Sequence, residues 1–192
     1  MITELTKDQI FNNQIKYMEL LSKLGVDLTA FSTYLEANDY FTKPLSATGP
    51  YAFEGGLCQY ALNLCYELGG LVGAYRDGQY TEQDIIKVAL LKDVYRAELY
   101  EAYTKNTKND ATGEWESVTA YKYKENRATF GDLNFNSYMV IKHFFELTDE
   151  QIEAITQSAT RDTFGGDIHD ILRSYPLLTL TKMADIAANY LI

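Results

Sequence analysis

Apolar residues recur at every third or fourth position over most of the chain, the spacing that places them on one face of a helix. Thr6, Thr81 and Thr148 are placed to cap three of these segments, and Pro176 opens the last one. We therefore predict helices from the Thr6 cap to Gly25 and over residues 29–37, 57–75, 81–95, 135–145, 149–158 and 176–191.

One region departs from this pattern and alternates apolar with polar residues, as a half-exposed strand does. Residues 100–107 and 114–123 flank a segment rich in turn formers, Asn109 to Gly113. Residues 41–56 hold several prolines and glycines and are predicted to be a loop. The predicted fold class is mainly α, with a single domain over residues 1–192. In it, residues 1–50 form the N-terminal helices and a β-hairpin at 100–123 projects from a helical body.

Composition and charge narrow the range of partners. The 192 residues carry a formal net charge of −10, with a pI near 4.7. Such an acidic chain argues against nucleic acid or an anionic membrane surface as the main partner. No apolar run approaches the ~20 residues of a membrane span, and no signal peptide is visible. We expect a cytoplasmic protein.

Tyrosine and tryptophan point to a protein partner. Tyrosine occurs 16 times, and it suits binding faces because its ring is apolar and its hydroxyl polar. Trp115, Tyr121 and Tyr123 share one face of the second strand, so they either contact a partner or a second copy, or pack the hairpin onto the body. The cysteines, Cys58 and Cys65, lie ~10 Å apart on one predicted helix, too far for a disulfide.

Three segments, in this order, resemble the HD-domain phosphohydrolase superfamily in the form found in bacteriophages and prophages. They are Phe53–Asn63, Ala89–Arg96 and Tyr175–Asp185, which are similar to the family's Gly-Gly-Leu, Ala-Leu-Leu-His-Asp and Tyr-Pro-Leu to His-x-Ala-Asp motifs. Residues 113–115 also look like the hairpin turn of the phage form. The resemblance implies an HD-like helical bundle and a phage-encoded protein in the host cytoplasm, and it leaves a role in the virion open.

The family's chemistry needs a metal centre, in which histidines and two aspartates bind divalent ions that activate water. Here the histidine positions hold Tyr60, Lys92 and Lys182, and only Asp93 and Asp185 remain of the metal set. An ammonium group has no lone pair for a metal, and two of them nearby would repel one. We expect no bound metal, no other cofactor and no hydrolysis of the family's kind.

Two interpretations of the former metal centre stay open. In the first, Lys–Asp pairs neutralise the two aspartates that the metal would otherwise balance, while the Tyr60 phenol fills the space of a ligand. In the second, Lys92, Lys182 and Arg96 form a metal-free pocket for phosphate or a nucleotide, to which Arg161 would contribute.

Two classes of function therefore remain. The first is a non-catalytic protein on an enzyme fold, which binds a host factor, inhibits a defence system or serves in the virion. The second is a divergent phosphohydrolase or nucleotidase that uses Asp93 and Asp185, joined by Asp132. The two histidines, His143 and His169, fall on no ligand position of the family and are interpreted as surface or capping residues.

Overall fold

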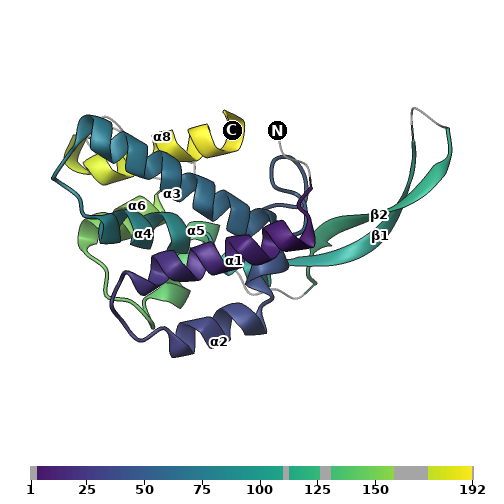
Figure 1. Cartoon of the computed structure of the whole chain (residues 1–192), viewed down its shortest axis with the longest axis horizontal. Helices are drawn as coiled ribbons and strands as arrows, with labels where there is room; N and C mark the ends of the chain where they lie inside the picture. The colour runs from purple at the N-terminus through teal and green to yellow at the C-terminus, as the bar shows by residue number, and fades with distance from the viewer. Residues whose placement is uncertain (1–3, 110–112, 126–130, 158–172, 192) are drawn as a thin grey trace.

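The structure is a computed structural model that describes residues 4–109, 113–125, 131–157 and 173–191. Within these ranges the chain forms a helical body and one β-hairpin that extends from it (Figure 1). The α-helices are α1 (Lys7–Ser22), α2 (Thr29–Ala37), α3 (Gly56–Tyr75), α4 (Glu82–Leu91), α5 (Leu133–Ile141), α6 (Asp149–Thr156) and α8 (Pro176–Tyr190). Two 3-10 helices, η1 (Tyr40–Thr42) and η2 (Val94–Glu98), and two strands, β1 (Tyr100–Lys108) and β2 (Trp115–Tyr123), complete the fold. Arg161 and His169 lie outside the described residues.

The predicted caps begin three of the helices. Thr6, Thr81 and Thr148 each accept a hydrogen bond from the backbone N–H three residues later, and the side chain at that position accepts one from the cap's own backbone. Each such capping box satisfies two backbone donors and stabilises its helix by about 1 kcal/mol. Pro176 occupies the first turn of α8, where its missing N–H costs nothing. These starts are confirmed, as are both ends of α2.

The predicted helix over residues 81–95 is wrong at its end. The structure ends α4 at Leu91, and the chain continues through Lys92 and Asp93 into η2. Consecutive residues of an α-helix do not face each other. Because the chain leaves the helix here, the side chains of Lys92 and Asp93 can meet. The helix predicted from residue 135 also begins earlier, since Asp132 accepts a hydrogen bond from the backbone of Asn134 and caps α5.

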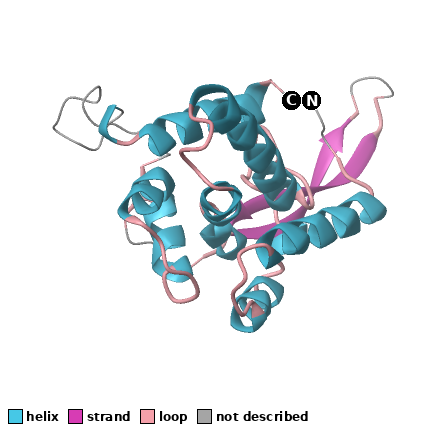
Figure 2. Ribbon diagram, turned by 60° about the vertical axis from the view of Figure 1, so that its left-hand side comes forward, coloured by secondary structure: helices cyan, strands magenta, loops and turns pink. Residues whose placement is uncertain are grey.

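One hydrophobic cluster fills the body and takes residues from Tyr17 in α1 to Ala188 in α8. Residues 88–91 of α4 belong to this cluster, and at most 2% of any of them is exposed. Figure 2 shows the helices gathered around a central one, with the strands to one side. Burial of each large aliphatic side chain contributes about 1.5–3 kcal/mol. The Tyr17 hydroxyl also donates to the carbonyl oxygen of Leu90 (2.7 Å), which ties α1 to the end of α4.

The hairpin matches its prediction in position and pairing. Its strands are antiparallel, in a register that runs from Tyr100 opposite Tyr123 to Lys108 opposite Trp115. Tyr100 is buried and stacks on the Tyr123 ring, with centroids 5.0 Å apart, and so anchors the base of the hairpin to the body. The far half of the hairpin, toward its turn, projects away from the helices (Figure 1). Among the described helices, none has both the length and the apolar character that crossing a membrane requires.

Candidate functional site

Three segments that are distant in sequence converge on one buried centre. α3 contributes Tyr60, the junction between α4 and η2 contributes Lys92, Asp93 and Arg96, and α8 contributes Asp185. These are the three segments that resemble the HD-domain superfamily. Six of their residues were predicted to form the former metal centre, and the structure brings five of the six together.

A pair of glycines sets the start of α3. Gly55 has φ +80°, a conformation that side-chain-bearing residues rarely adopt. Gly56 lies so close to the carbonyl oxygen of Tyr51 that a Cβ would collide with it. The close approach positions the Tyr51 ring against the Tyr60 ring, with centroids 5.5 Å apart, and thereby fixes the wall of the centre.

Asp93 is the hub of a buried ion network. The Lys92 ammonium lies 2.6 Å from its Oδ2, and the Arg96 Nε lies 2.5 Å from its Oδ1, so a cation holds each carboxylate oxygen. Lys92 is 3% exposed and Asp93 is 4% exposed. Lys92 also donates to the Tyr60 hydroxyl (2.9 Å) and lies 3.7 Å from Asp185 Oδ1.

These contacts determine the charge states in the centre. Burial would raise the pKa of Asp93, but the charges of Lys92 and Arg96 and their hydrogen bonds lower it to about 2. Burial, followed by the charges of Asp93 and Asp185, raises the pKa of Tyr60 well above 10, so its phenol is neutral and donates to Asp185. Two cations therefore balance two anions, with a neutral hydroxyl between them.

The donors present do not fit the metal centre of the resembled family. Both oxygens of Asp93 are occupied by protein cations, and the ammonium of Lys92 offers no lone pair where the family has a histidine. In the described ranges, no group of three or more His, Cys, Asp or Glu side chains is arranged to hold a metal ion. The described contacts of this centre are ion pairs and hydrogen bonds between protein groups.

Lys182 is the predicted site residue that the structure does not bring into the network. It lies half-buried, one turn before Asp185 on α8, and it forms no ion pair with any residue in the described part of the chain. An amide that was not predicted takes part instead: Asn189 Nδ2 donates to Asp185 Oδ1 (3.0 Å). Its spacing of four residues from Asp185 on one helix was the available signal.

A small cavity opens beside the network. It has a volume of about 240 Å³ and is lined by Tyr60, Lys92, Arg96, Asp185, Asn134, Asn189 and the loop residues Leu45, Ser46 and Pro50. Arg96 also donates to the carbonyl oxygen of Leu45 (3.2 Å), which holds the predicted loop against the centre. Small-molecule sites usually occupy about 300–1,000 Å³, so this space suits an ion such as phosphate better than a nucleotide.

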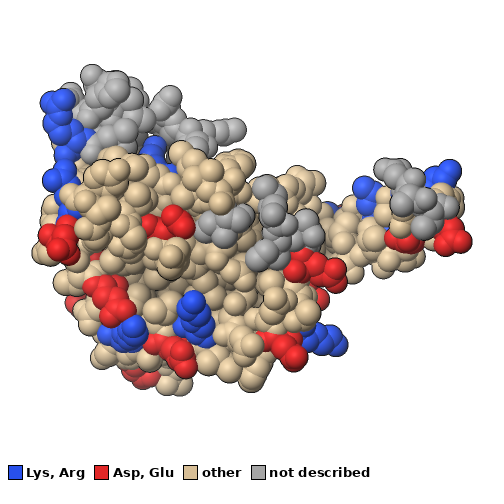
Figure 3. All heavy atoms as spheres, turned by 45° about the horizontal axis from the view of Figure 1, so that its top comes forward, with Lys and Arg blue, Asp and Glu red and all other residues tan. Residues whose placement is uncertain are grey.

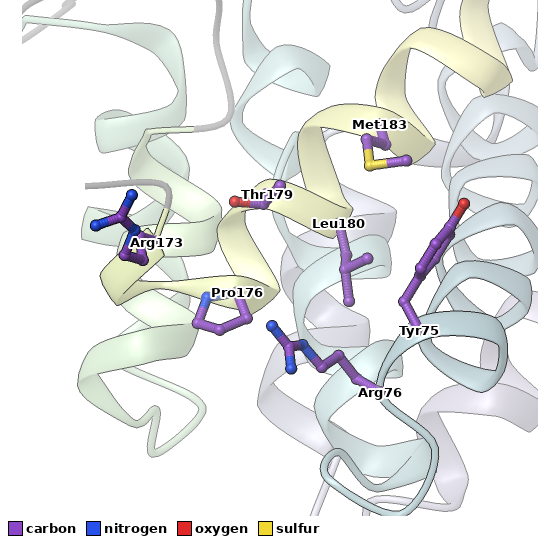
Figure 4. Close-up of a pocket in the computed structure, with 7 residues that line it drawn as sticks. All are labelled: Tyr75, Arg76, Arg173, Pro176, Thr179, Leu180 and Met183. Carbon is purple, nitrogen blue, oxygen red and sulfur yellow. The ribbon is translucent and has the colours of Figure 1, made fainter. Parts of the chain in front are cut away.

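A larger cavity, about 490 Å³, lies at the other side of the body between the end of α3 and the start of α8 (Figure 4). None of its lining residues was predicted as a site: Tyr75, Arg76, Arg173, Pro176, Thr179, Leu180 and Met183. In Figure 4 the Arg76 side chain extends toward Pro176, and Leu180 points into the space between the helices. Basic side chains also gather at the end of the body opposite the hairpin (Figure 3).

The predicted partner residues lie along the hairpin rather than in one patch. Trp115, at the far end of β2, is 73% exposed, whereas Tyr123 lies at the base. Tyr121 is half-buried and lines a groove of about 440 Å³ between β2 and the body, with Leu5 and Phe53 among its walls. A strand rises about 3.4 Å per residue, so Trp115 and Tyr121 lie roughly 20 Å apart along it.

The chain was compared with known proteins in three ways. A scan against protein-family models, a search of curated proteins and a search of solved structures each found no match to the chain. The likeness to the HD-domain superfamily therefore rests on residues of this chain alone.

Proposed function

We propose that this chain is a non-catalytic protein with an HD-like helical body and that it acts by binding a protein partner through its hairpin. The observation that carries the proposal is the exposure of the hairpin, in which Tyr100 alone among the strand residues is buried. A two-stranded hairpin is only marginally stable by itself in water. A partner that covers its strands would bury the exposed Trp115 ring and stabilise the projection.

The buried centre supports the non-catalytic half of the proposal. Hydrolysis of the family's kind needs a metal-bound water, and the carboxylate best placed to hold that metal, Asp93, is already paired on both oxygens. The centre then has a structural role, since its charges are compensated by protein groups alone.

The cavity beside the network favours a second candidate, in which the centre binds phosphate without a metal. Lys92 and Arg96 both line it. Their charges are balanced by Asp93 and Asp185, however, so the cavity carries little excess attraction for an anion. Because of this charge balance, phosphate binding is the second candidate function, after binding of a protein partner.

A capture experiment tests the hairpin. The purified chain, its Trp115→Ala variant and a Tyr66→Ala control are immobilised and exposed to a lysate of the bacterial host that the phage resemblance implies. Tyr66 is a matched control because its ring is 78% exposed but lies on α3 in the body. We expect a protein that is retained by the wild type and the control and lost with Trp115→Ala. Equal retention by all three, with circular dichroism unchanged, contradicts the proposal.

An assay of phosphate release tests the non-catalytic half. The chain is incubated with a panel of phosphate monoesters and diesters, with and without Mn²⁺. We expect no release above the protein-free rate. Release that requires Mn²⁺ and disappears in Asp93→Asn overturns the proposal in favour of a divergent phosphohydrolase.

A further inference from the structure

The outer edge of β2 has a defined pattern of backbone groups. At the base of the hairpin the Lys124 N–H donates to the carbonyl oxygen of Leu99 (2.9 Å), and at the turn the Asn109 N–H donates to that of Glu114 (2.8 Å). In an antiparallel pair, residues that bond across the pair alternate with residues whose N–H and C=O point away. Even-numbered residues of β2 therefore bond to β1, and odd-numbered residues present their backbone groups at the outer edge.

No third strand lies beside this edge within the described ranges. An exposed edge is a template for another strand. Its distal half, from Trp115 to Val118, is exposed at every residue.

The side chains of β2 are complementary to a second copy of β2. We consider antiparallel pairing of the two β2 strands about a two-fold axis at Thr119. In this register two residues lie opposite each other, one from each copy, when their numbers add up to 238. Thr119 then meets itself, and Glu116 meets Lys122 of the second copy. The same register sets Trp115 opposite Tyr123, and Glu114 opposite Lys124. Threonine pairs, aromatic pairs and opposite charges are each favourable across strands.

Neighbouring registers lose this match. An axis at Val118 leaves Glu116 opposite an alanine, and an axis at Ala120 leaves Glu114 beyond the end of the paired strand. The axis at Val118 pairs only Glu114 with a lysine, and the axis at Ala120 pairs only Glu116 with one. The axis at Thr119 pairs both glutamates with lysines, and the symmetry forms each of these pairs twice. Charge thus selects one register for a symmetric pairing.

We propose that β2 pairs with β2 of a second copy about Thr119, so that two hairpins form one four-stranded antiparallel sheet. Five residues of β2 present their backbone N–H and C=O groups at the outer edge, so this register forms five backbone-bonded pairs. Each pair exchanges two hydrogen bonds, about ten in all, which is the number in a typical protein interface. Because the dimer assumes that the hairpin contacts a protein, it rests on the proposed function, and it adds a second copy of the chain to the proteins that the hairpin binds.

The distribution of charge permits this dimer. Between residues 100 and 124, four lysines balance four acidic residues, so the net charge of −10 resides in the rest of the chain. Antiparallel pairing sends the two bodies to opposite ends of a sheet of nine-residue strands, about 30 Å long. That length exceeds the Debye length of about 8 Å at physiological salt, which screens the repulsion between the bodies.

The groove beside β2 offers room for the second strand. Val118, Thr119 and Tyr121 line it from the hairpin, and Leu5 and Phe53 line it from the body. In the proposed register the second copy passes along these hairpin residues with its own residues 117–120. On the body side the incoming strand then faces Leu5, Ala52 and Phe53 together with the acidic Glu4 and Glu54.

Two charge reversals and their mixture test the dimer by sedimentation equilibrium. The wild type is expected to dimerise at micromolar concentrations. Glu116→Lys and Lys122→Glu are each expected to weaken the dimer about ten- to hundredfold, since two pairs change from attraction to repulsion at once. An equimolar mixture of the two variants is expected to form a heterodimer with near wild-type affinity, because each reversed residue then meets its opposite charge.

The mixture separates pairing from folding. Lys122 also forms an ion pair with Glu101 of its own chain (2.9 Å), so Lys122→Glu alone could weaken the hairpin. Loss of that intramolecular pair would not be repaired by mixing. A wild type that is still monomeric at about 100 μM, roughly a hundred times the expected micromolar dissociation constant, overturns the inference. A dimer that neither variant weakens also overturns it.

The outcomes also separate this inference from the proposed function. A monomeric wild type that captures another protein through Trp115 leaves the proposed function in place and removes the self-pairing. A monomeric wild type without capture removes both. A dimer that both reversals weaken and that the mixture restores supports both.

Discussion

Replacing one charge of the Lys92–Asp93 pair tests whether the centre of the body is held by compensation between ions. Asp93→Asn keeps the shape of the side chain and removes its charge. The Lys92 ammonium, 3% exposed, then retains only Asp185 at 3.7 Å as a carboxylate partner. Lys92→Met removes the other member and leaves Asp93 with Arg96 at 2.5 Å.

The expected losses follow from distance and burial. At 2.6 Å the attraction between unit charges is about 6 kcal/mol for an effective dielectric constant near 20, and about 1.6 kcal/mol in water. Desolvation costs several kcal/mol per ion, so the intact pair contributes little net stability. Removing one partner leaves an uncompensated charge. We expect Asp93→Asn to lower the free energy of unfolding by about 3–5 kcal/mol, and Lys92→Met by about 1–3 kcal/mol because Arg96 remains.

The assay is a double-mutant cycle read by urea unfolding at pH 7. The double variant Lys92→Met/Asp93→Asn is expected to lose less than the sum of the single losses, by about 1–3 kcal/mol. Lys23 and Glu82 provide the control, since their charged atoms are also 2.6 Å apart but their side chains are 48% and 62% exposed. Their cycle is expected to give a coupling below about 1 kcal/mol.

Additive losses at Lys92 and Asp93, within about 0.5 kcal/mol, would refute the reasoning. So would equal couplings for the buried and the exposed pair. Either result would mean that burial does not set the strength of this pair.

Three further predictions follow from the same structure. The pKa of Asp93 is lowered to about 2 from ~3.9 in the unfolded chain, so its contribution of about 2–3 kcal/mol is present above pH 4 and lost as pH falls toward 2; urea unfolding at pH 7 and 2.5 should show this loss, and Asp93→Asn should reduce it. Gly56→Ala should destabilise the chain by about 1–3 kcal/mol through its collision with a carbonyl oxygen, whereas Gly69→Ala, in open space on α3, should stabilise it by about 0.5–1 kcal/mol; thermal unfolding that ranks the two variants the other way would contradict this. Burial raises the pKa of the Cys58 thiol, and raises that of half-buried Cys65 to about 11, so a thiol reagent at pH 8 should modify Cys65 first and Cys58 only on unfolding, as mass spectrometry of the labelled peptides would show.

Features that depend on neighbours in sequence could be predicted. The capping threonines Thr6 and Thr148 satisfy backbone groups within three residues, and the hairpin is specified by its turn formers and alternating strands. In these cases the residues that form the structure lie within the window that shows the pattern.

Features that depend on tertiary contacts could not be predicted from the sequence. α4 ends at Leu91 where Lys92 and Asp93 enter the buried centre, although the apolar pattern continues to Tyr95. The resemblance identified Asp185, but it gave no reason to expect that Asn189 rather than Lys182 would contact it. Which side chain of α8 reaches the centre depends on the rotation of that helix against α3, and the sequence of α8 alone does not determine that rotation.

The sequence spacing of the ion network has a consequence for the order of folding. A metal centre of the resembled kind would join residues near 60, 93 and 185, and closing a loop of 92 residues costs about 4 kcal/mol of chain entropy. Here the cations on Asp93 come from Lys92 and Arg96, one and three residues away. Its charge can therefore be compensated as soon as the turn after α4 forms, before the C-terminal helix arrives. When α8 docks, it brings Asp185 to a Lys92 ammonium that already has a carboxylate partner, so this helix completes the network rather than starting it.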